Sequence, residues 1–234
     1  MNVALFGRGR MGTLVAEHLR RGGHTVGVVL AGAEGAADAD AVAARLAGHD
    51  VAIDFSVGTA VLRNVSACVQ AGVPVVEGAT GWHDDYEAVV RAVARAQGGL
   101  VIGENLSIGV NLFYRVVARA AELYGSLGGY AAFIEEAHHA GKRDAPSGTA
   151  LRIKVLLADR FGQDVAIAST RAGQIPGVHR VGFDGPHDQV TLEHAARSRE
   201  GFAEGAVLAA QWLVGRRGVF RFSDVLDDLL GGKA

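Results

Sequence analysis

The feature that most constrains the fold is a glycine-rich turn near the N-terminus. Residues 7–12 read Gly-Arg-Gly-Arg-Met-Gly and lie between an apolar run, Val3–Phe6, and an amphipathic helical pattern, Met11–Arg21. A G-x-G-x-x-G turn in this position is typical of a dinucleotide-binding βαβ unit, because its glycines allow a tight turn, approach of the backbone to a pyrophosphate, and close helix–strand packing. The alternative is a glycine turn without a ligand. The position after a first strand favours phosphate binding by the residues of this turn, which are Gly7, Arg8, Gly9, Arg10, Met11 and Gly12.

The chain up to Asn105 keeps alternating short apolar runs with amphipathic stretches, which is the pattern of a parallel sheet covered by helices on both faces. Further strands are expected at His24–Leu30, Val51–Phe55, Val73–Val76 and Leu100–Ile102. The helices between them are expected at Ala36–Ala47, Thr59–Ala71 and Asp84–Gln97. The sequence therefore predicts an α/β fold that begins with a Rossmann-type parallel sheet.

After Asn105 the pattern changes to that of a second, α+β domain. Helical patterns are found at Val110–Tyr124 and Thr149–Phe161, and strand-like runs at Ala131–Glu136, Val165–Arg171, His179–Phe183 and Gln189–His194. Because the last three runs are joined by short connections, we expect a mixed or antiparallel sheet. Terminal helices at Phe202–Val214 and Ser223–Leu230 are expected to pack back onto the first domain. The predicted domains are residues 1–106 completed by residues 203–234, for dinucleotide binding, and residues 107–202.

Composition limits the class of function. The formal net charge is −2, and no basic stretch is interleaved with aromatic residues, so nucleic acid is not an expected partner. No apolar run approaches the ~20 residues needed to cross a bilayer, and the N-terminus lacks the basic segment of a signal peptide. The only cysteine, Cys68, cannot form an internal disulfide and fits a reducing compartment. We expect a cytoplasmic protein without nucleic-acid or membrane partners.

The end of the second strand bears on the choice between NADH and NADPH. That strand runs into Ala31-Gly32 with no charged residue before Glu34, whereas NAD-binding domains commonly place an acidic residue there for the ribose. Arg8 and Arg10 lie in the phosphate turn, and a guanidinium suits bidentate contact with phosphate. We expect use of both cofactors, with a modest preference for NADPH.

The segment from Glu135 to Ala150 concentrates reactive side chains in the second domain. It reads Glu-Glu-Ala-His-His-Ala-Gly-Lys-Arg-Asp-Ala-Pro-Ser-Gly-Thr-Ala. Two histidines and a lysine therefore lie at the end of an expected strand and in the loop that precedes the next helix. The helix start, a threonine hydroxyl and the lysine ammonium are expected to converge on an anion, most simply a carboxylate. Histidine can move a proton near neutral pH, and adjacent strand residues point to opposite faces, so the two histidines are expected to differ in role. The residues concerned are His138, His139, Lys142, the capping residue Ser147, Gly148 and Thr149.

Simpler interpretations of this segment are structural histidines and ordinary helix capping. A His-His pair can also bind a metal, but no cysteine lies nearby and no third ligand follows at a recognisable spacing, so no metal is expected. Two histidines, one lysine and a capped helix start, in a chain with a dinucleotide turn, favour a catalytic site.

The string His-His-x-x-Lys-x-Asp-Ala-Pro-Ser-Gly-Thr-Ala resembles the signature of the 4-hydroxy-tetrahydrodipicolinate reductase family, formerly called dihydrodipicolinate reductases. Other segments resemble motifs of this family in the same order along almost the whole chain. They are Ile53–Ser56 (I-D-F-[ST]), Gly78–Gly81 (G-T-T-G), Asn105–Asn111 (N-[FM]-S-[VI]-G-V-N), Arg171–His179 (R-[AG]-G-[DE]-I-x-G-x-H) and the run from Ser198 to Ala206 (S-S-R-x-x-F-A-x-G-A).

The resemblance implies a reaction and the residues that carry it. The reaction is the NAD(P)H-dependent reduction of a cyclic imine dicarboxylate, 4-hydroxy-tetrahydrodipicolinate, to tetrahydrodipicolinate in lysine and diaminopimelate biosynthesis. His138 is implied as proton donor or acceptor, and Lys142 as a second proton donor. Substrate binding is implied for His139, Ser147, Gly148 and Thr149. Besides the glycine turn, the residues implied to line the cofactor are Phe55, Ser56, Gly78, Ala79, Thr80, Asn105 and Leu106. A homotetramer assembled through the sheet of residues 107–202 is also implied.

Three departures from the family pattern concern the cofactor half. Ala79 replaces the first threonine of G-T-T-G, Glu104 stands where the family has a small residue or proline, and the glycine turn is one residue shorter than G-x-x-G-R-M-G. None of them falls in the segment with the histidines and the lysine.

Two other functions remain open from the residues alone. One is a related Rossmann-fold reductase or dehydrogenase that acts on another amino or imino acid, and the cluster of histidines, lysine and Ser-Gly-Thr argues against it. The other is a non-catalytic NAD(P)-binding regulator, which would be expected to have lost His138 or Lys142.

Overall fold

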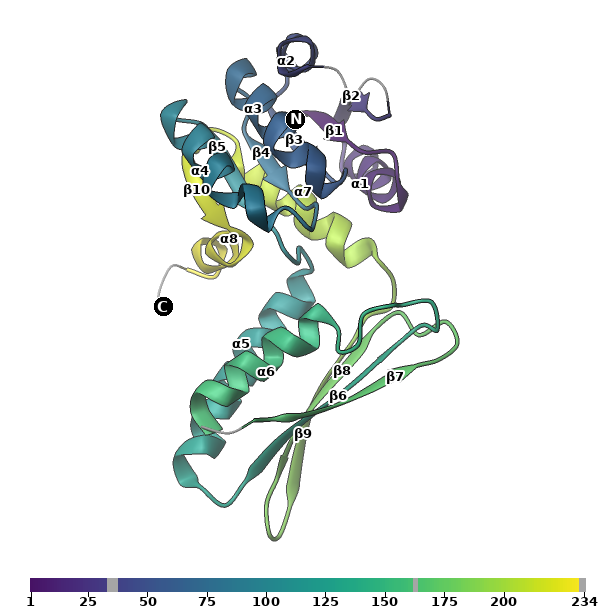
Figure 1. The fold of residues 1–234 in the computed structure, drawn as a ribbon, viewed down its shortest axis with the longest axis vertical. Coiled ribbons are helices and arrows are strands. Elements are labelled where there is room, and N and C mark those ends of the chain that lie inside the picture. Colours follow the sequence, from purple (N-terminus) through teal and green to yellow (C-terminus); the bar gives the residue numbers. More distant parts are fainter. Residues whose placement is uncertain (33–37, 162–163, 232–234) are drawn as a thin grey trace. The chain divides into compact units, whose positions relative to one another are not determined.

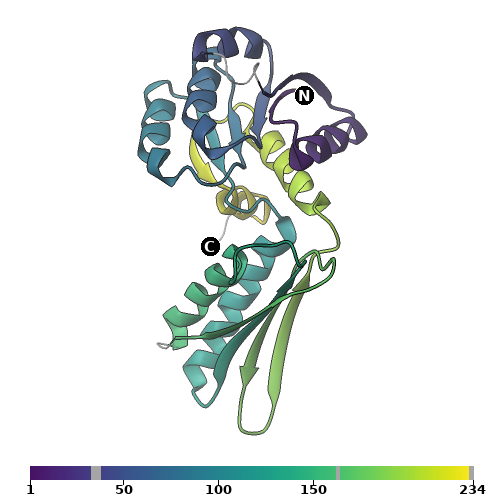
Figure 2. The same ribbon diagram turned by 45° about the vertical axis from the view of Figure 1, so that its right-hand side comes forward.

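The computed structural model describes residues 1–32, 38–161 and 164–231 and divides the chain into two compact units. The first unit comprises Met1–Ile108 and the C-terminal residues from Glu200 onward, and the second comprises Gly109–Arg199. Each has its own sheet and helices (Figures 1 and 2). Each also has its own hydrophobic core. The predicted class, a parallel α/β sheet joined to an α+β domain with a mixed sheet, is confirmed.

The sheet of the first unit has six parallel strands in the order β10-β5-β4-β3-β1-β2. Their bounds are β1 (Asn2–Phe6), β2 (Thr25–Leu30), β3 (Val51–Asp54), β4 (Val75–Glu77), β5 (Gly99–Ile102) and β10 (Gly218–Arg221). The prediction of only helices in the C-terminal segment was wrong, because β10 pairs with β5 at the edge of the sheet. This strand has four residues, of which none is fully buried, so its hydrophobic pattern is weak.

Helices cover both faces of this sheet because successive strand residues point to opposite faces and the residues on both faces are apolar. Val3 and Leu5 pack against α1 and α7, whereas Ala4 and Phe6 contribute to the core on the side of α2, α3 and α4. The helices are α1 (Arg10–Arg21), α2 (Ala39–Leu46), α3 (Val61–Ala71), α4 (Tyr86–Arg95), α7 (Glu200–Leu213) and α8 (Phe222–Leu229). α2 begins after Asp38, whose carboxylate accepts a hydrogen bond from the Ala41 amide at 2.8 Å. The predicted start of this helix at residues 36–37, Glu34, and residues 232–234 lie outside the described residues.

The second unit packs two helices on one face of a four-stranded sheet (Figures 1 and 2). The strand order is β7-β6-β8-β9, with β6 and β7 parallel and the other pairs antiparallel. The elements are α5 (Ile108–Leu127), β6 (Ala131–His138), α6 (Gly148–Phe161), β7 (Ala166–Arg171), β8 (Val178–Asp184) and β9 (Gln189–Ala195). Ile134 and Phe183 from the sheet pack with Val117 of α5 and Ile153 of α6. In the described part of the chain, no helix has the length and apolar character needed to cross a membrane.

Candidate active site and dinucleotide site

The residues predicted to bind the cofactor come together at one edge of the parallel sheet. Because all strands of the first unit run in the same direction, the turns that follow β1, β3, β4 and β5 share the carboxyl edge. These turns contain the predicted segments Gly7–Gly12, Phe55–Ser56, Gly78–Thr80 and Asn105–Leu106. β2 and β3 lie on opposite sides of β1, and such a switch in strand order is where open α/β sheets bind ligands.

The three glycines of the first turn have different reasons to lack a side chain. Gly7 has φ of +93°, and a Cβ there would lie 2.6 Å from the carbonyl oxygen of Phe55. A Cβ at Gly12 would collide with the carbonyl of Gly7. By contrast, a Cβ at Gly9, the N-cap of α1, would meet nothing within 4 Å, and no side chain caps this helix. The protein's own packing requires glycine at positions 7 and 12. At position 9 the protein leaves space, and a pyrophosphate bound at the helix start would explain the glycine there. The turn therefore fits a dinucleotide.

The other predicted cofactor residues differ in what they offer a ligand. Thr80 is exposed, and Phe55 and Ser56 are half-buried. Ala79 is buried, and its carbonyl accepts a hydrogen bond from Nε1 of Trp82 at 2.9 Å. Leu106 is 1% exposed and packs into the core, so its backbone rather than its side chain is left for a cofactor contact.

Arg8 and Arg10 are both exposed at the start of α1. Met11 packs partly against the core, and the amide of Gly7 donates to the carbonyl of Leu30, the last residue of β2, at 2.9 Å. This hydrogen bond holds the glycine-rich turn of residues 7–12 against the end of β2, which in a dinucleotide-binding domain faces the adenosine ribose.

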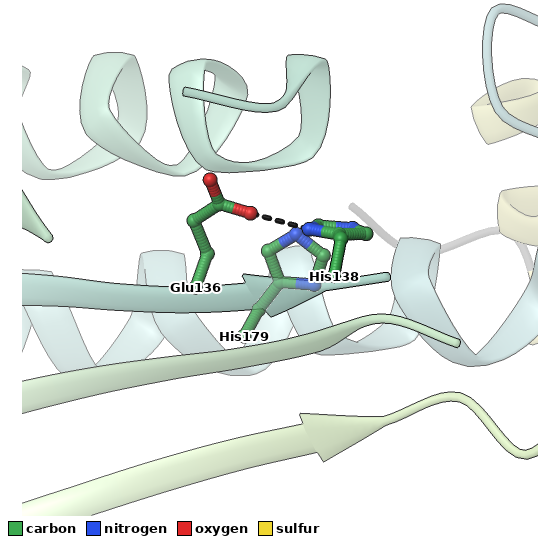
Figure 3. A group of neighbouring side chains, drawn as sticks. All are labelled: Glu136, His138 and His179. Atoms are coloured by element: carbon green, nitrogen blue, oxygen red, sulfur yellow. Dashed lines mark ion pairs between the residues drawn. The ribbon is translucent and has the colours of Figure 1, made fainter. Parts of the chain in front are cut away.

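In the second unit, β6 delivers His138 and Glu136 to the same buried face. The strand alternates exposed or half-buried with buried residues, and Glu136 and His138 are 2% and 8% exposed. Nδ1 of His138 lies 2.5 Å from Oε2 of Glu136 (Figure 3). A carboxylate at Nδ1 fixes the imidazole, which leaves Nε2 as the atom that can exchange a proton with a ligand. A Cβ at Gly177 would lie 3.2 Å from this Nε2, so the glycine leaves room beside it.

Arg171 at the end of β7 keeps Glu136 charged. Nη2 of Arg171 donates to Oε1 of Glu136 at 2.7 Å. Burial favours the neutral carboxyl, but hydrogen bonds from Arg171 and Ser169 and the proximity of His138 outweigh it and lower the pKa of Glu136 to about 2. For His138, burial is the largest influence and holds the pKa of the imidazole below its ordinary value, against the opposing effect of Glu136.

His179 joins this pair from β8, directly across from Glu136. Figure 3 shows the three side chains on the same side of the sheet. The ring centroids of His138 and His179 are 5.1 Å apart, and the angle between the ring planes is 72°. Burial, with a contribution from His138, lowers the pKa of His179 to about 4, so this imidazole is neutral near pH 7. Oγ of Ser147 lies 3.1 Å from Nε2 of His179 and accepts a hydrogen bond from the Ala150 amide at 3.3 Å.

The remaining predicted substrate residues lie in the segment from the end of β6 to the first turn of α6. Gly148 is the first residue of the helix. Ser147 is 2% exposed, and its hydroxyl contacts His179 and caps the helix. Nζ of Lys142 is bound to Oδ1 of Asp144 at 2.8 Å, and its side chain is 25% exposed. His139 and Thr149 are half-buried. Lys142 is therefore already paired with a carboxylate, which an anionic substrate would have to displace.

Glu136, His138 and His179 each offer one possible metal-ligand atom, and these atoms lie within 4.8 Å of one another. Arg171 binds the same carboxylate, so a divalent cation would sit beside a fixed positive charge. We therefore interpret the cluster as a group that handles a proton, and the absence of a metal stays a prediction.

The sequence-based site lacks Glu136, Arg171 and His179. Glu136 precedes His138 by two residues, which places both on one face of a strand, so this pair could have been found from the alternation. Arg171 and His179 become neighbours of Glu136 only through the β6–β7 and β6–β8 pairings, which local sequence does not contain.

Two family profiles together match nearly the whole chain. The profile described as dihydrodipicolinate reductase, N-terminus, matches residues 1–106. The profile described as dihydrodipicolinate reductase, C-terminus, matches residues 109–226.

Relatives and solved structures agree with these profiles. A 4-hydroxy-tetrahydrodipicolinate reductase of Christiangramia forsetii is 36% identical over 243 residues, which cover 98% of this chain and 99% of the relative. One from Anaeromyxobacter dehalogenans is 40% identical over 227 residues, covering 87% and 83%. In fold, the chain is similar to the dipicolinate-bound dihydrodipicolinate reductase from Paenisporosarcina sp. TG-14, with a TM-score of 0.77, 20% identity, and coverage of 94% of this chain and 97% of that one. The chain belongs to the 4-hydroxy-tetrahydrodipicolinate reductase family.

Proposed function

We propose that this protein reduces 4-hydroxy-tetrahydrodipicolinate to tetrahydrodipicolinate with NADPH or NADH, as a step of lysine and diaminopimelate biosynthesis. The observation that carries the proposal is the buried Glu136–His138 pair beside the capped start of α6, in a chain whose other unit has a dinucleotide turn. Membership of the reductase family supports the same reaction.

The protein's part in this reaction is to supply a proton and to hold the substrate. The 4-hydroxyl group of the substrate leaves as water to give a conjugated ring, and NAD(P)H, when bound, would supply the hydride to that ring. His138 then gives a proton through Nε2, while Glu136 at Nδ1 orients the ring and stabilises its protonated form. General acid catalysis of this kind typically contributes ~10²–10⁴ in rate.

The substrate carries two carboxylates, and the start of α6 offers groups that bind them. The first amides of a helix lack intrahelical acceptors, and the helix dipole favours an anion there. Thr149 is the second residue of α6, and His139 and Lys142 lie in the segment between β6 and α6. Holding both carboxylates fixes the ring relative to His138, which lowers the barrier by removing orientational freedom before the reaction.

Substrate binding also changes the charge state of His138. In the free protein, burial keeps the pKa of this imidazole below its ordinary value. A bound dicarboxylate places negative charge nearby, which favours the protonated ring. The acid is therefore charged most readily when its substrate is present.

The test supplies purified protein with NADPH or NADH and with the fresh product of dihydrodipicolinate synthase, and follows the absorbance of the reduced nicotinamide. We expect cofactor oxidation that requires the synthase product and is lost in His138→Gln. His187→Gln changes an exposed loop histidine of the same unit and should behave as wild type. If the cofactor binds but is not oxidised, the proposed reaction is wrong, and a reductase of another imino acid or an NAD(P)-binding regulator becomes the better interpretation.

We also propose that the protein is a cytoplasmic homotetramer whose subunits meet through the sheet of the second unit. Support comes from the family resemblance and, for the compartment, from the free, buried thiol of Cys68. On the face of this sheet away from α5 and α6, Arg180 pairs with Glu135 at 2.9 Å and with Glu193 at 2.7 Å. Sedimentation equilibrium tests the assembly, and a species of 24.3 kDa, the mass of one chain, would contradict it.

A further inference from the structure

Two buried carboxyl groups lie side by side beneath the turns predicted to hold the cofactor. Asp54 is the last residue of β3 and Glu77 is the last residue of β4, and the two are partners in the parallel register. They are 0% and 1% exposed. The proposed proton transfer from His138 uses neither of them.

Each carboxyl group holds the first turn of the loop that follows its own strand. Oδ1 of Asp54 accepts the backbone amide of Ser56 at 2.6 Å, and Oδ2 accepts the side-chain amide of Asn64 from α3 at 2.7 Å. Oε1 of Glu77 accepts the backbone amide of Ala79 at 2.7 Å. Ser56 and Ala79 are both among the residues implied to line the cofactor.

The two loops also pack directly on each other. A Cβ at Gly58 would lie 2.5 Å from the carbonyl oxygen of Gly81 and 2.6 Å from that of Thr80. A Cβ at Gly78 would lie 2.6 Å from the ring of Phe55. Since neither contact has space to spare, a shift of one loop displaces the other.

The surroundings of the pair leave one hydrogen-bonding position unfilled. No N–H or O–H group of the described residues bonds to the buried Oε2 of Glu77. No described basic side chain forms an ion pair with either carboxyl group. Arg63 donates from Nη2 and Nε to Oδ1 of Asn64, at 3.1 and 3.3 Å, and not to Asp54. The Cys68 thiol of α3 is neutral, because burial raises its pKa.

A proton on Glu77 satisfies all of these groups at once. It turns the unfilled oxygen of Glu77 into a donor toward Asp54, whose charge is then stabilised by Ser56 and Asn64 as well. Burial and the neighbouring Asp54 raise the pKa of Glu77 well above its ordinary value. Burial also raises the pKa of Asp54, against the effect of its hydrogen bonds.

We propose that Asp54 and Glu77 share one proton and act as a positioning pair that holds the Ser56 and Ala79 turns in the arrangement that binds the dinucleotide. This rests on the proposed use of NAD(P)H. Loss of the shared proton places two negative charges side by side in a buried site, so the turns separate and the cofactor binds more weakly. The effect belongs to cofactor affinity and not to the proton transfer at His138.

The shared proton has a spectroscopic signature that does not depend on activity. Infrared spectra of the whole protein at about pH 7 should show the carbonyl stretch of a protonated carboxylic acid, because exposed Asp and Glu are ionised at that pH. The band should be lost in Glu77→Gln and kept in Glu87→Gln, which changes an exposed glutamate of α4. In Asp54→Asn it should disappear at a lower pH than in wild type, since one of the two causes of the raised pKa is removed.

Cofactor binding tests the positioning role. NADPH affinity is measured by fluorescence titration between about pH 6 and pH 10, and in wild type Kd should rise by up to about tenfold per pH unit above the pKa of the pair. Glu77→Gln is neutral and can still accept from Ala79 and donate to Asp54, so its Kd should match wild type at about pH 7 and lose the alkaline rise.

The outcomes separate this inference from the proposed function. Absence of the band in wild type overturns the shared proton. If the band is present but the Kd of NADPH depends on pH in the same way in wild type and Glu77→Gln, the positioning role is overturned. The positioning role is also overturned if the band is present but the cofactor does not bind at any pH. If the profile is lost in Glu77→Gln as expected but the synthase product is not reduced, the inference stands and the proposed reaction fails.

Discussion

At the scale of single residues, the charge of His138 decides the pH dependence of the proposed reaction. A general acid has to carry its proton in the free enzyme for kcat/KM to be high, and burial holds the pKa of this imidazole below its ordinary value. We therefore expect kcat/KM to fall as the pH rises through a pKa below ~6.5. The fall in kcat should come at a higher pH, because the bound dicarboxylate favours the protonated ring. Steady-state profiles of both constants measure the difference.

Glu136→Gln supplies the matched variant for this prediction. The amide removes the charge that raises the pKa of His138, so the descending limb of kcat/KM should move to lower pH, and kcat should fall by up to ~10²-fold. Glu122→Gln is the control, because this half-buried carboxylate of the same unit also pairs with an arginine, at 3.0 Å from Arg160. A Glu136 variant with the wild-type profile would show that this carboxylate does not act on His138.

Gly9 and Gly12 should respond differently to the same substitution. A side chain at Gly9 meets no protein atom within 4 Å, so Gly9→Val should fold but occupy the space needed by the pyrophosphate and abolish NAD(P)H binding. Gly12→Val collides with the backbone of Gly7, so it should lose thermal stability as well. Fluorescence titration and thermal unfolding of both variants make the comparison. Normal cofactor affinity in Gly9→Val would refute the placement of the dinucleotide.

Arg8 and Arg10 carry the prediction about cofactor preference. β2 ends at Leu30 and runs into Ala31 and Gly32, so no carboxylate at these positions repels a 2′-phosphate. We expect a modest preference for NADPH, and a direct contact from either arginine to that phosphate contributes ~1.5–3 kcal/mol. Steady-state kinetics of Arg8→Ala and Arg10→Ala with both cofactors should show a selective loss with NADPH in at least one variant. A wild type that strongly prefers NADH would contradict the assignment.

At the scale of elements, the residue that caps α6 contributes both to the stability of the fold and to the candidate active site. Ser147 caps the helix and also contacts His179, so Ser147→Ala removes a cap and leaves a buried imidazole nitrogen without its partner. We expect the free energy of unfolding to fall by ~1–3 kcal/mol. Ser126→Ala, at an exposed serine of α5, should change it by less than ~0.5 kcal/mol. Chemical denaturation measures both, and equal losses would remove the special role of Ser147.

The elements also show how far local sequence reaches. Strands buried on both faces and helices with apolar stripes repeat a strong pattern, so β1, β3 and α1 were predicted within one or two residues. β10 was missed because an edge strand of four half-exposed residues carries little pattern, and its pairing with β5 joins segments far apart in the chain. The same limit applies to the site: His138 stands out by its neighbours in sequence, whereas His179 becomes part of it only through strand pairing.

At the scale of the whole molecule, the two units have separate cores and separate ligands in the proposed function. The first core is built around the parallel sheet, and the second joins α5 and α6 to the mixed sheet. Local opening of each unit should therefore be controlled mainly by the ligand that binds to it. The proposed function places dinucleotide binding in the first unit and substrate binding in the second, and this division stays a prediction.

Hydrogen exchange of the full-length protein tests that division. A ligand at ~100 times its Kd stabilises the state that binds it by ~2.7 kcal/mol, so exchange through opening of the bound unit should slow by up to ~100-fold. We expect NADPH alone to protect amides of β1, β3 and α1, and the fresh product of dihydrodipicolinate synthase, supplied without cofactor, to protect amides of β6, β8 and α6. Gly9→Val should lose only the first effect and His138→Gln should keep it. If NADPH protects both units equally in wild type, cofactor and substrate binding do not divide between the units, and the proposed domain roles are wrong.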